Sequence, residues 1–247
     1  MKSKACVLGM GIVAALAASG VAAYEAGDII VRAGSATLDP DGSSSGVALP
    51  ALDIAPLAGT HTQVDSDTQL GLSLTYMLSG SLGLELLAAT PFSHAIGANL
   101  MAAGLGAIKA GVTKHLPPTL SLVWYPLGSG NRVSPYVGAG INYTVFFDES
   151  AHADLEYAAG ALAGLDGPVP MSLKLEDSVG LAAQAGVDVA LSERWHLNLA
   201  VRWIDIETQA TFKARDGSVI PAGTTIARVD DVDIDPWVYQ LNVGYRF

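Results

Sequence analysis

The segment 42–46 has the residue types of a catalytic serine motif. It reads GSSSG, which matches the G-x-S-x-G pattern of a hydrolase nucleophile elbow. Such an elbow needs a strand before the serine and a helix after it, because the sharp turn between them exposes the hydroxyl group. This segment lies in a stretch rich in Pro, Gly and Ser, so we interpret it as a loop.

Carboxylates and histidines supply the other candidate ligands. Asp230, Asp231, Asp233 and Asp235 resemble the acidic run of a calcium loop, but the turn glycine and terminal glutamate of that loop are missing. We interpret the run as a solvated loop that leads into the last strand. The five histidines show no spacing typical of metal ligands, and His94 either shapes an entrance or is a polar residue at a rim. No cofactor, metal or enzymatic activity is therefore predicted.

The first residues predict export. Two lysines precede an apolar run over 6–18, and small residues at 21–23 offer a cleavage site, so we expect 1–23 to be a secretory signal peptide. The apolar run is shorter than the roughly 20 residues of a spanning helix. Cleavage would remove the one cysteine, Cys6, and both lysines, which changes the formal charge from −11 to −13 (−11 minus 2). An acidic exported chain is not expected to bind nucleic acid.

The rest of the chain alternates apolar and polar residues with the period of two that is typical of β-strands. In the segment 67–79, Leu70, Leu72 and Leu74 share one face, whereas the other face is small or polar and nearly uncharged. A soluble sheet would be expected to carry charges on its wet face. An apolar face toward lipid and a small polar face toward a lumen indicate a transmembrane barrel.

Eight such segments are present, at 28–36, 67–79, 82–90, 119–125, 133–147, 179–191, 195–204 and 239–247. Several reach the length of a membrane-spanning strand, about 9–11 residues. Short connections strictly alternate with long ones near 37–66, 91–116, 148–177 and 210–234. A barrel with short periplasmic turns and four long extracellular loops has this pattern. The predicted fold is an all-β, eight-stranded antiparallel transmembrane barrel over 24–247, located in the bacterial outer membrane.

Aromatic residues bracket the apolar stripes, as they do in the interfacial girdles of membrane barrels. We assign to this girdle Tyr76, Trp124, Tyr143, Trp195, Trp203, Tyr239 and Tyr245. The last segment ends on Phe247, and we expect it to pair with the first strand around 29–32, because a barrel in lipid has no free edge. A terminal aromatic residue also resembles the signal that the barrel-assembly machinery reads.

Several stretches resemble one protein family. They are AGDIIVRAGSAT (26–37), TQLGLSLTYM (68–77), GLELLAATPFSHAIG (83–97), HLPPTL (115–120), PYVGAGINYTVFFD (135–148), and DPWV with the terminal GYRF (235–247). Together they are similar to the OmpW-type outer-membrane proteins, a family that includes AlkL and OprG. The resemblance implies a narrow, partly apolar lumen and passive uptake of small hydrophobic molecules. These would enter from outside and leave through a lateral opening in the barrel wall.

Strand parity assigns the residues of the lumen. An eight-stranded barrel is just wide enough inside to be filled by side chains or to hold one small ligand, which excludes a wide aqueous pore. The inward-facing apolar residues would favour greasy solutes over hydrated ions, whose desolvation is costly. They are Leu87, Val123, Phe146 and Ile204, and Glu85 shares the inward face of Leu87.

Arg202 departs from the family pattern. In the family, the position of Leu87 belongs to an apolar gate whose second member is a tryptophan, and Arg202 occupies the place of that tryptophan here. We expect Arg202 to pair with Glu85, Asp188 or Asp205. It would either block the lumen or tune it toward amphipathic solutes.

Three prolines mark the candidate lateral opening. Pro91, Pro117 and Pro118 lie where the third strand ends and the fourth begins, and proline cannot donate a ladder hydrogen bond. The alternative is that these prolines merely end the strands.

Two other functions stay open beside transport: a structural or adhesive barrel with a plugged lumen, and a lipid-modifying enzyme, for which no catalytic constellation can be assembled. The expected partners are the bilayer with its lipopolysaccharide, small hydrophobic solutes and the assembly machinery. The chain is expected to act as a monomer.

Overall fold

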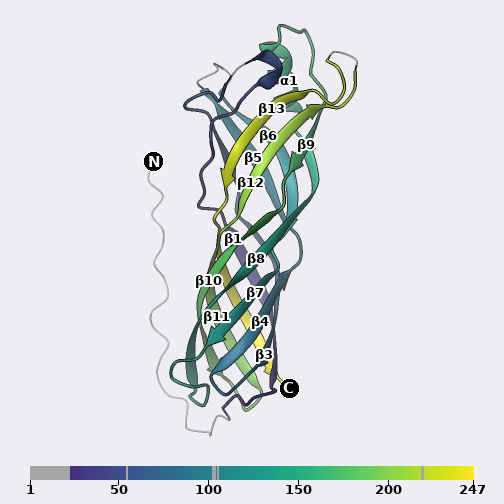
Figure 1. The fold of residues 1–247 in the computed structure, drawn as a ribbon. Helices are drawn as coiled ribbons and strands as arrows, with labels where there is room; N and C mark the ends of the chain where they lie inside the picture. Colours follow the sequence, from purple (N-terminus) through teal and green to yellow (C-terminus); the bar gives the residue numbers. More distant parts are fainter. Residues whose placement is uncertain (1–22, 54, 102–103, 105, 218–219) are drawn as a thin grey trace, which may run out of the picture.

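Eight strands form a closed antiparallel barrel in the computed structural model, which describes residues 23–53, 55–101, 104, 106–217 and 220–247 (Figure 1). In order around the barrel they are β1 (Ile29–Asp39), β3 (Asp67–Met77), β4 (Leu82–Ala89), β7 (Thr119–Trp124), β8 (Val133–Ala151), β10 (Ser178–Ala190), β11 (Trp195–Ile204) and β14 (Trp237–Arg246). The last strand closes the barrel by pairing with the first, with Ile30 opposite Arg246. The predicted eight-stranded barrel and its seam are therefore confirmed.

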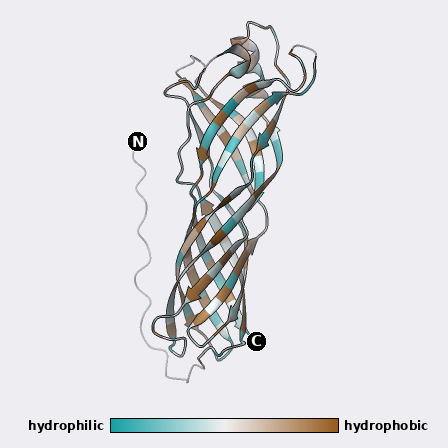
Figure 2. Ribbon diagram, viewed as in Figure 1, coloured by the Kyte–Doolittle hydropathy of each residue, from teal (hydrophilic) through white to brown (hydrophobic). Residues whose placement is uncertain are grey.

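The outer face of the barrel strands is apolar. Along β3, Leu70, Leu72 and Leu74 are 50%, 42% and 47% exposed, whereas the alternate residues Ser73 and Thr75 are buried. Figure 2 shows hydrophobic and hydrophilic residues alternating along the strands of the lower half. So continuous an apolar surface would be unfavourable in water and matches the lipid-facing band of a membrane barrel.

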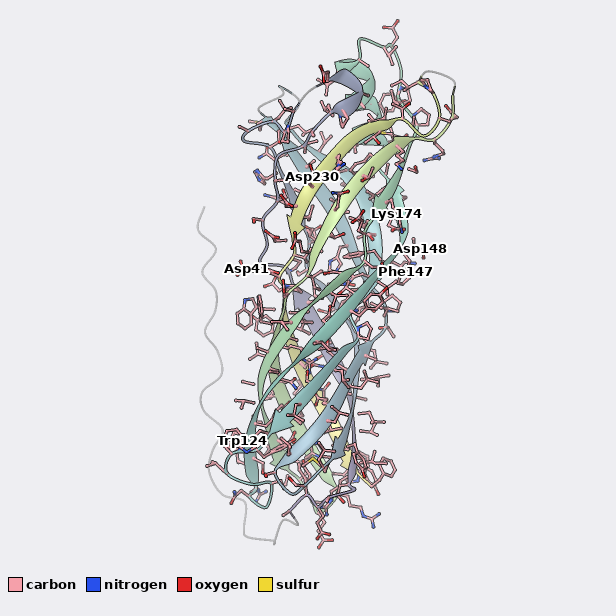
Figure 3. The ribbon with its side chains drawn as sticks, viewed as in Figure 1. Asp41, Trp124, Phe147, Asp148, Lys174 and Asp230 are labelled. Atoms are coloured by element: carbon pink, nitrogen blue, oxygen red, sulfur yellow. The ribbon has the colours of Figure 1, made fainter. Side chains whose placement is uncertain are left out.

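Aromatic side chains stand on the outer face near both ends of this band. Near the short turns, Trp195 lies opposite Tyr245, and their ring centroids are 4.8 Å apart. Figure 3 places Trp124 at the same end, and at the other end Trp203 lies opposite Trp237. All the residues predicted for the girdle are exposed or half-buried: Tyr76, Trp124, Tyr143, Trp195, Trp203, Tyr239 and Tyr245. Their placement suits the predicted girdle, and Trp237 is a further member that was not predicted.

The long connections continue the barrel upward as regular structure (Figure 1). The hairpin of β5 (Phe92–Leu100) and β6 (Gly106–Leu116), with β2 (His61–Val64) at its edge, extends the barrel sheet. A second sheet contains β9 (Met171–Leu175), β12 (Glu207–Ala214) and β13 (Thr225–Asp233). The connections also contain η1 (Pro50–Leu52) and α1 (Ala153–Leu162). The alternation of short and long connections holds, but the strands within the long ones were not predicted.

The acidic run belongs to one of these strands. Asp230, Asp231 and Asp233 lie in β13, so their interpretation as a loop was wrong, and Asp235 follows the strand. The strand forms because Val229 and Val232 are buried while β12 supplies its hydrogen-bond partners. The aspartates themselves are exposed or half-buried, as a solvated run should be.

The interior contains two apolar clusters. The lower cluster, near the short turns, consists of Tyr24, Ile30, Met77, Val123, Tyr125 and Tyr136. The upper cluster fills the extension and includes Phe92, Phe146 and Ile204.

No helix in the described part of the chain is long and apolar enough to cross a membrane. The expected signal peptide, 1–23, lies outside the described residues apart from Ala23.

Leu72→Arg should destabilise the barrel in lipid. Leu72 lies on the lipid-facing band between Ala33 and Ala88 of the neighbouring strands, and arginine in the middle of such a band costs about 2–4 kcal/mol. Met101→Arg is the control, because Met101 is 69% exposed beyond the end of β5. Urea unfolding in lipid vesicles measures both variants. Equal losses of unfolding free energy would contradict a lipid-facing position for Leu72.

Candidate functional site

Arg32 lies at the centre of the barrel lumen. Its side chain is 1% exposed, and all five of its N–H groups donate hydrogen bonds. The acceptors are Glu85 Oε2 at 3.0 Å, Thr75 Oγ1 at 2.8 Å, Asp188 Oδ2 at 2.8 Å, the Tyr125 hydroxyl at 2.9 Å and His196 Nε2 at 3.2 Å. One guanidinium thus connects five strands across the lumen.

Glu85 links this centre to the second buried arginine. Arg202 Nη2 donates to Glu85 Oε1 at 2.7 Å and also to Gln184 Oε1, while Gln184 Nε2 donates to Glu85 Oε1 at 3.0 Å. The predicted pairing of Arg202 with Glu85 is therefore confirmed, whereas Asp188 pairs with Arg32 instead. We call Arg32, Glu85, Asp188 and Arg202 the ion network.

The charges of the ion network balance. Two guanidinium groups face two carboxylates, and all four side chains are at most 3% exposed. An isolated buried charge would be very unfavourable, so each group depends on its partners to stay in the lumen. The ion network closes the lumen at its level by fixed side chains. Charged side chains thus occupy the lumen at this level, where the sequence predicted an apolar constriction.

The predicted lumen residues do not meet in one gate. Leu87, Val123, Phe146 and Ile204 all face inward and are at most 4% exposed, as predicted. Val123 lies opposite Gly83, below Glu85, whereas Leu87 is two residues above Glu85 on β4. Phe146 and Ile204 belong to the upper cluster. Strand parity gave the correct face of each residue but not its height along the barrel.

Tyr24 fills the lumen below the ion network. Its hydroxyl donates to Asp188 Oδ2 at 3.0 Å, and its ring meets the ring of Tyr125 edge to face, with centroids 5.4 Å apart. Its backbone N–H donates to Ser129 Oγ at 2.7 Å. The side chain of Tyr24 therefore adds a second layer to the closed floor of the lumen.

A stack of four rings lies above the ion network, on the inner face of the extension. His94 and His115 stack with ring centroids 4.9 Å apart, and Phe92 and Phe146 lie 5.7 and 5.5 Å from His115. These rings adjoin a mainly apolar cavity of about 30 Å³ that His94, His115 and Phe146 line. We call this cavity with its ring stack the apolar chamber.

The two histidines are buried but lack protein partners at most of their ring nitrogens. Within the described part of the chain, His94 Nε2 and both ring nitrogens of His115 make no hydrogen bond. Each unsatisfied buried group costs about 1–3 kcal/mol. His115 lies above the lipid-facing band, because its neighbour Lys114 forms an exposed ion pair with Asp148 at 3.1 Å. Burial lowers the pKa of His115 to about 3 and also lowers the pKa of His94, so both rings are neutral at pH 7.

The barrel wall is interrupted beside the apolar chamber. Pairing between β4 and β7 ends at Leu87 opposite Thr119, and pairing between β5 and β6 begins at Phe92 opposite His115. Residues 88–91 and 116–118, all within the described part of the chain, form no ladder pairs with each other. We call this break the strand interruption.

Pro91 and Pro117 lie within the strand interruption. The Thr90 N–H donates to Leu70 on β3, and the Pro118 carbonyl accepts from Tyr143 on β8. Because backbone groups of successive strand residues point to opposite neighbours, Pro117 is directed toward the strand of Pro91. The alternation is broken at Pro91, because the N–H groups of Thr90 and of Ser93 both point toward β3, to Leu70 and to Asp67. Neither proline has an N–H group, so neither can donate a hydrogen bond across the break.

Several of these residues were missed in the sequence. The inward direction of Arg32 could have been inferred from strand parity, because Arg32 shares the inward face of β1 with Ile30 and Leu38. Tyr24 lies before the first strand, where strand parity gives no information. The stacking of the two histidines depends on β5 and β6, which lie in a connection where no strand was predicted.

In the described residues, no group of three or more His, Cys, Asp or Glu could hold a metal ion.

Comparisons with known proteins agree with this architecture. A family model described as the OmpW family matches residues 25–247. The chain is similar to outer membrane protein W of Vibrio cholerae, with 42% identity over 99% of this chain and 100% of that protein. It is also similar to outer membrane protein AlkL of Ectopseudomonas oleovorans, with 26% identity over 82% of this chain and 72% of that protein. The crystal structure of OprG from Pseudomonas aeruginosa matches with a TM-score of 0.77 and 42% identity, covering 92% of this chain and 99% of OprG.

Arg32→Met should be strongly destabilising. It leaves Asp188 without its arginine in a buried site, and removing one partner of a buried ion pair costs roughly 3–5 kcal/mol. Lys114→Met makes the same chemical change in the exposed pair with Asp148, where about 0–1 kcal/mol is expected. Urea unfolding of both variants in lipid vesicles gives the comparison. Similar losses in the two variants would show that the ion network does not hold the lumen together.

Proposed function

Because the chain belongs to the OmpW family of outer-membrane barrels, we propose that it is a passive channel for the uptake of small hydrophobic molecules. Solutes enter the apolar chamber from outside and leave sideways through the strand interruption into the membrane. The resemblance of the sequence to this family implies this direction of transport, from the outside into the membrane.

The closed floor of the lumen supports a sideways exit. Below the apolar chamber, the lumen is filled first by the ion network and then by Tyr24 and Tyr125. An apolar solute that moved straight through would have to separate charges that have lost most of their contact with water, which is costly. The floor therefore directs the solute toward the wall.

The strand interruption is the observation that carries the proposal. The rung below it contains Leu87 and the rung above it contains His115, so the break opens between the floor and the chamber. The prolines keep the break from closing, because their strands cannot donate to each other at these positions. Backbone unpaired in the middle of the hydrocarbon would be unfavourable, and this break lies toward the upper end of the band.

A structural barrel is the second candidate, and the ion network favours it. If the lumen is simply plugged, the protein stiffens the membrane or binds a partner through its extension, and no solute moves.

We further propose that the barrel acts as a monomer in contact with lipopolysaccharide, and that Phe247 serves as the signal for the assembly machinery.

Restoring hydrogen-bond donors at the strand interruption should reduce uptake. A Pro91→Val, Pro117→Val double variant restores an N–H group on both sides of the break, so the wall should close and hydrocarbon uptake should fall several-fold. Pro118→Val is the matched control, because the Pro118 backbone is directed toward β8. Uptake of radiolabelled hydrocarbon by cells carrying each variant at equal outer-membrane levels measures the effect. Unchanged uptake in the double variant would overturn the lateral route.

Leu87→Arg should also reduce uptake, because it places a charge at the lower edge of the exit. Leu87→Met conserves volume and apolar character and should transport as wild type does. The same uptake assay applies, with heat-modifiable migration in gels as the check that each barrel has folded. Equal uptake in the two variants, or no uptake by wild type, would favour the structural barrel.

A further inference from the structure

The apolar chamber presents hydrogen-bonding groups that no described part of the chain satisfies. His115 is 1% exposed, its two ring nitrogens have no partner, and it lines the cavity beside the strand interruption. His94 lines the same cavity with an unpartnered Nε2. Three histidine nitrogens in a mainly apolar cavity are therefore available to a ligand.

The chemistry of these nitrogens follows from their neighbours. His94 Nδ1 lies against the backbone carbonyl of Asp65, and a carbonyl oxygen can only accept a hydrogen bond. His94 Nδ1 therefore carries the proton, and Nε2 of the neutral ring is an acceptor. His115, also neutral, offers one donor and one acceptor. The unpartnered histidine nitrogens thus present two acceptors and one donor. Three threonines, Thr62, Thr113 and Thr208, also line the cavity, and no charged side chain does.

A neutral hydroxyl group matches this set. It can donate to His94 Nε2 or to the acceptor nitrogen of His115 and accept from the N–H of His115. A carboxylate or ammonium group would be buried without a counter-charge, which is unfavourable. A pure hydrocarbon or an ether would leave the acceptor nitrogens unsatisfied, because neither can donate.

We propose that the apolar chamber is a binding site for small neutral molecules that carry one hydroxyl group on an apolar body, such as phenols and medium-chain alcohols. The inference rests on the proposed function, because it names the class of solute that the channel selects. The cavity of about 30 Å³ has room for one or two water-sized groups and so accepts the hydroxyl end. The apolar body then extends past the ring of Phe146, which lines the cavity, toward the strand interruption.

A matched pair of fluorescent ligands tests this selectivity. In 1-methoxynaphthalene a methyl group replaces the hydroxyl hydrogen of 1-naphthol, so only 1-naphthol can donate a hydrogen bond. The affinities of both ligands are measured for the protein in lipid nanodiscs, with protein-free nanodiscs subtracted. Wild type should prefer 1-naphthol by about three- to tenfold, the effect of one net hydrogen bond. His115→Phe keeps a ring in the stack and should abolish the preference. His61→Phe makes the same change on β2 at a position that does not line the cavity, and should keep it.

¹⁵N NMR of the wild-type protein tests, without any variant, whether the hydroxyl group contacts the two histidines. With ¹⁵N-labelled histidine, 1-naphthol should shift the ring resonances of His115 and His94, whereas 1-methoxynaphthalene should shift them much less. Equal affinity of wild type for the two ligands, a preference that survives in His115→Phe, or no shift of the His115 resonances would each overturn the inference.

Failure of this inference and failure of the proposed function are distinguishable. Binding is measured without flux, so uptake that is sensitive to the proline variants but shows no hydroxyl preference would refute the binding site alone. A hydroxyl preference in a protein that transports nothing would refute transport and leave the binding site in place.

Discussion

The compensation of buried charge inside a narrow barrel is the constraint on which the rest of the molecule depends. Eight strands leave room for side chains rather than for water, so any charge that faces inward must find its counter-charge there. Arg32 meets this requirement with all five N–H groups, and Glu85 shares its two oxygens between Arg32 and Arg202. Loss of Arg32 would leave Asp188 without its arginine, and loss of Glu85 would leave Arg202 without its carboxylate, so the floor of the lumen depends on both.

The wall and the floor have complementary roles in this account. A barrel in lipid must pair its backbone groups, and the seam between β1 and β14 shows how completely most of the wall does so. The strand interruption is the exception, and it lies directly above the fixed floor and beside the apolar chamber. Pro91 and Pro117 lie within it, and neither has an N–H group to donate.

Sequence patterns predicted most of the barrel for a physical reason. A strand that separates lipid from a polar lumen must alternate, so Leu72 and Ser73 could be assigned to opposite faces before any coordinates were known. Alternation does not give height along the barrel, which is why Val123 and Phe146 were grouped although they belong to different clusters. The pairing of Arg32 with Asp188 depends on the closed three-dimensional barrel, so it could not be read from the chain.

The position of a bound solute tests the central claim most directly. Crystals of the protein soaked with a brominated apolar molecule would reveal that position through the anomalous signal of bromine. Sideways release predicts bromine density in the apolar chamber and between residues 88–91 and 116–118, with the ion network intact. Density alongside Arg32 or Val123, within a separated ion network, would show passage straight through the lumen and would contradict this account.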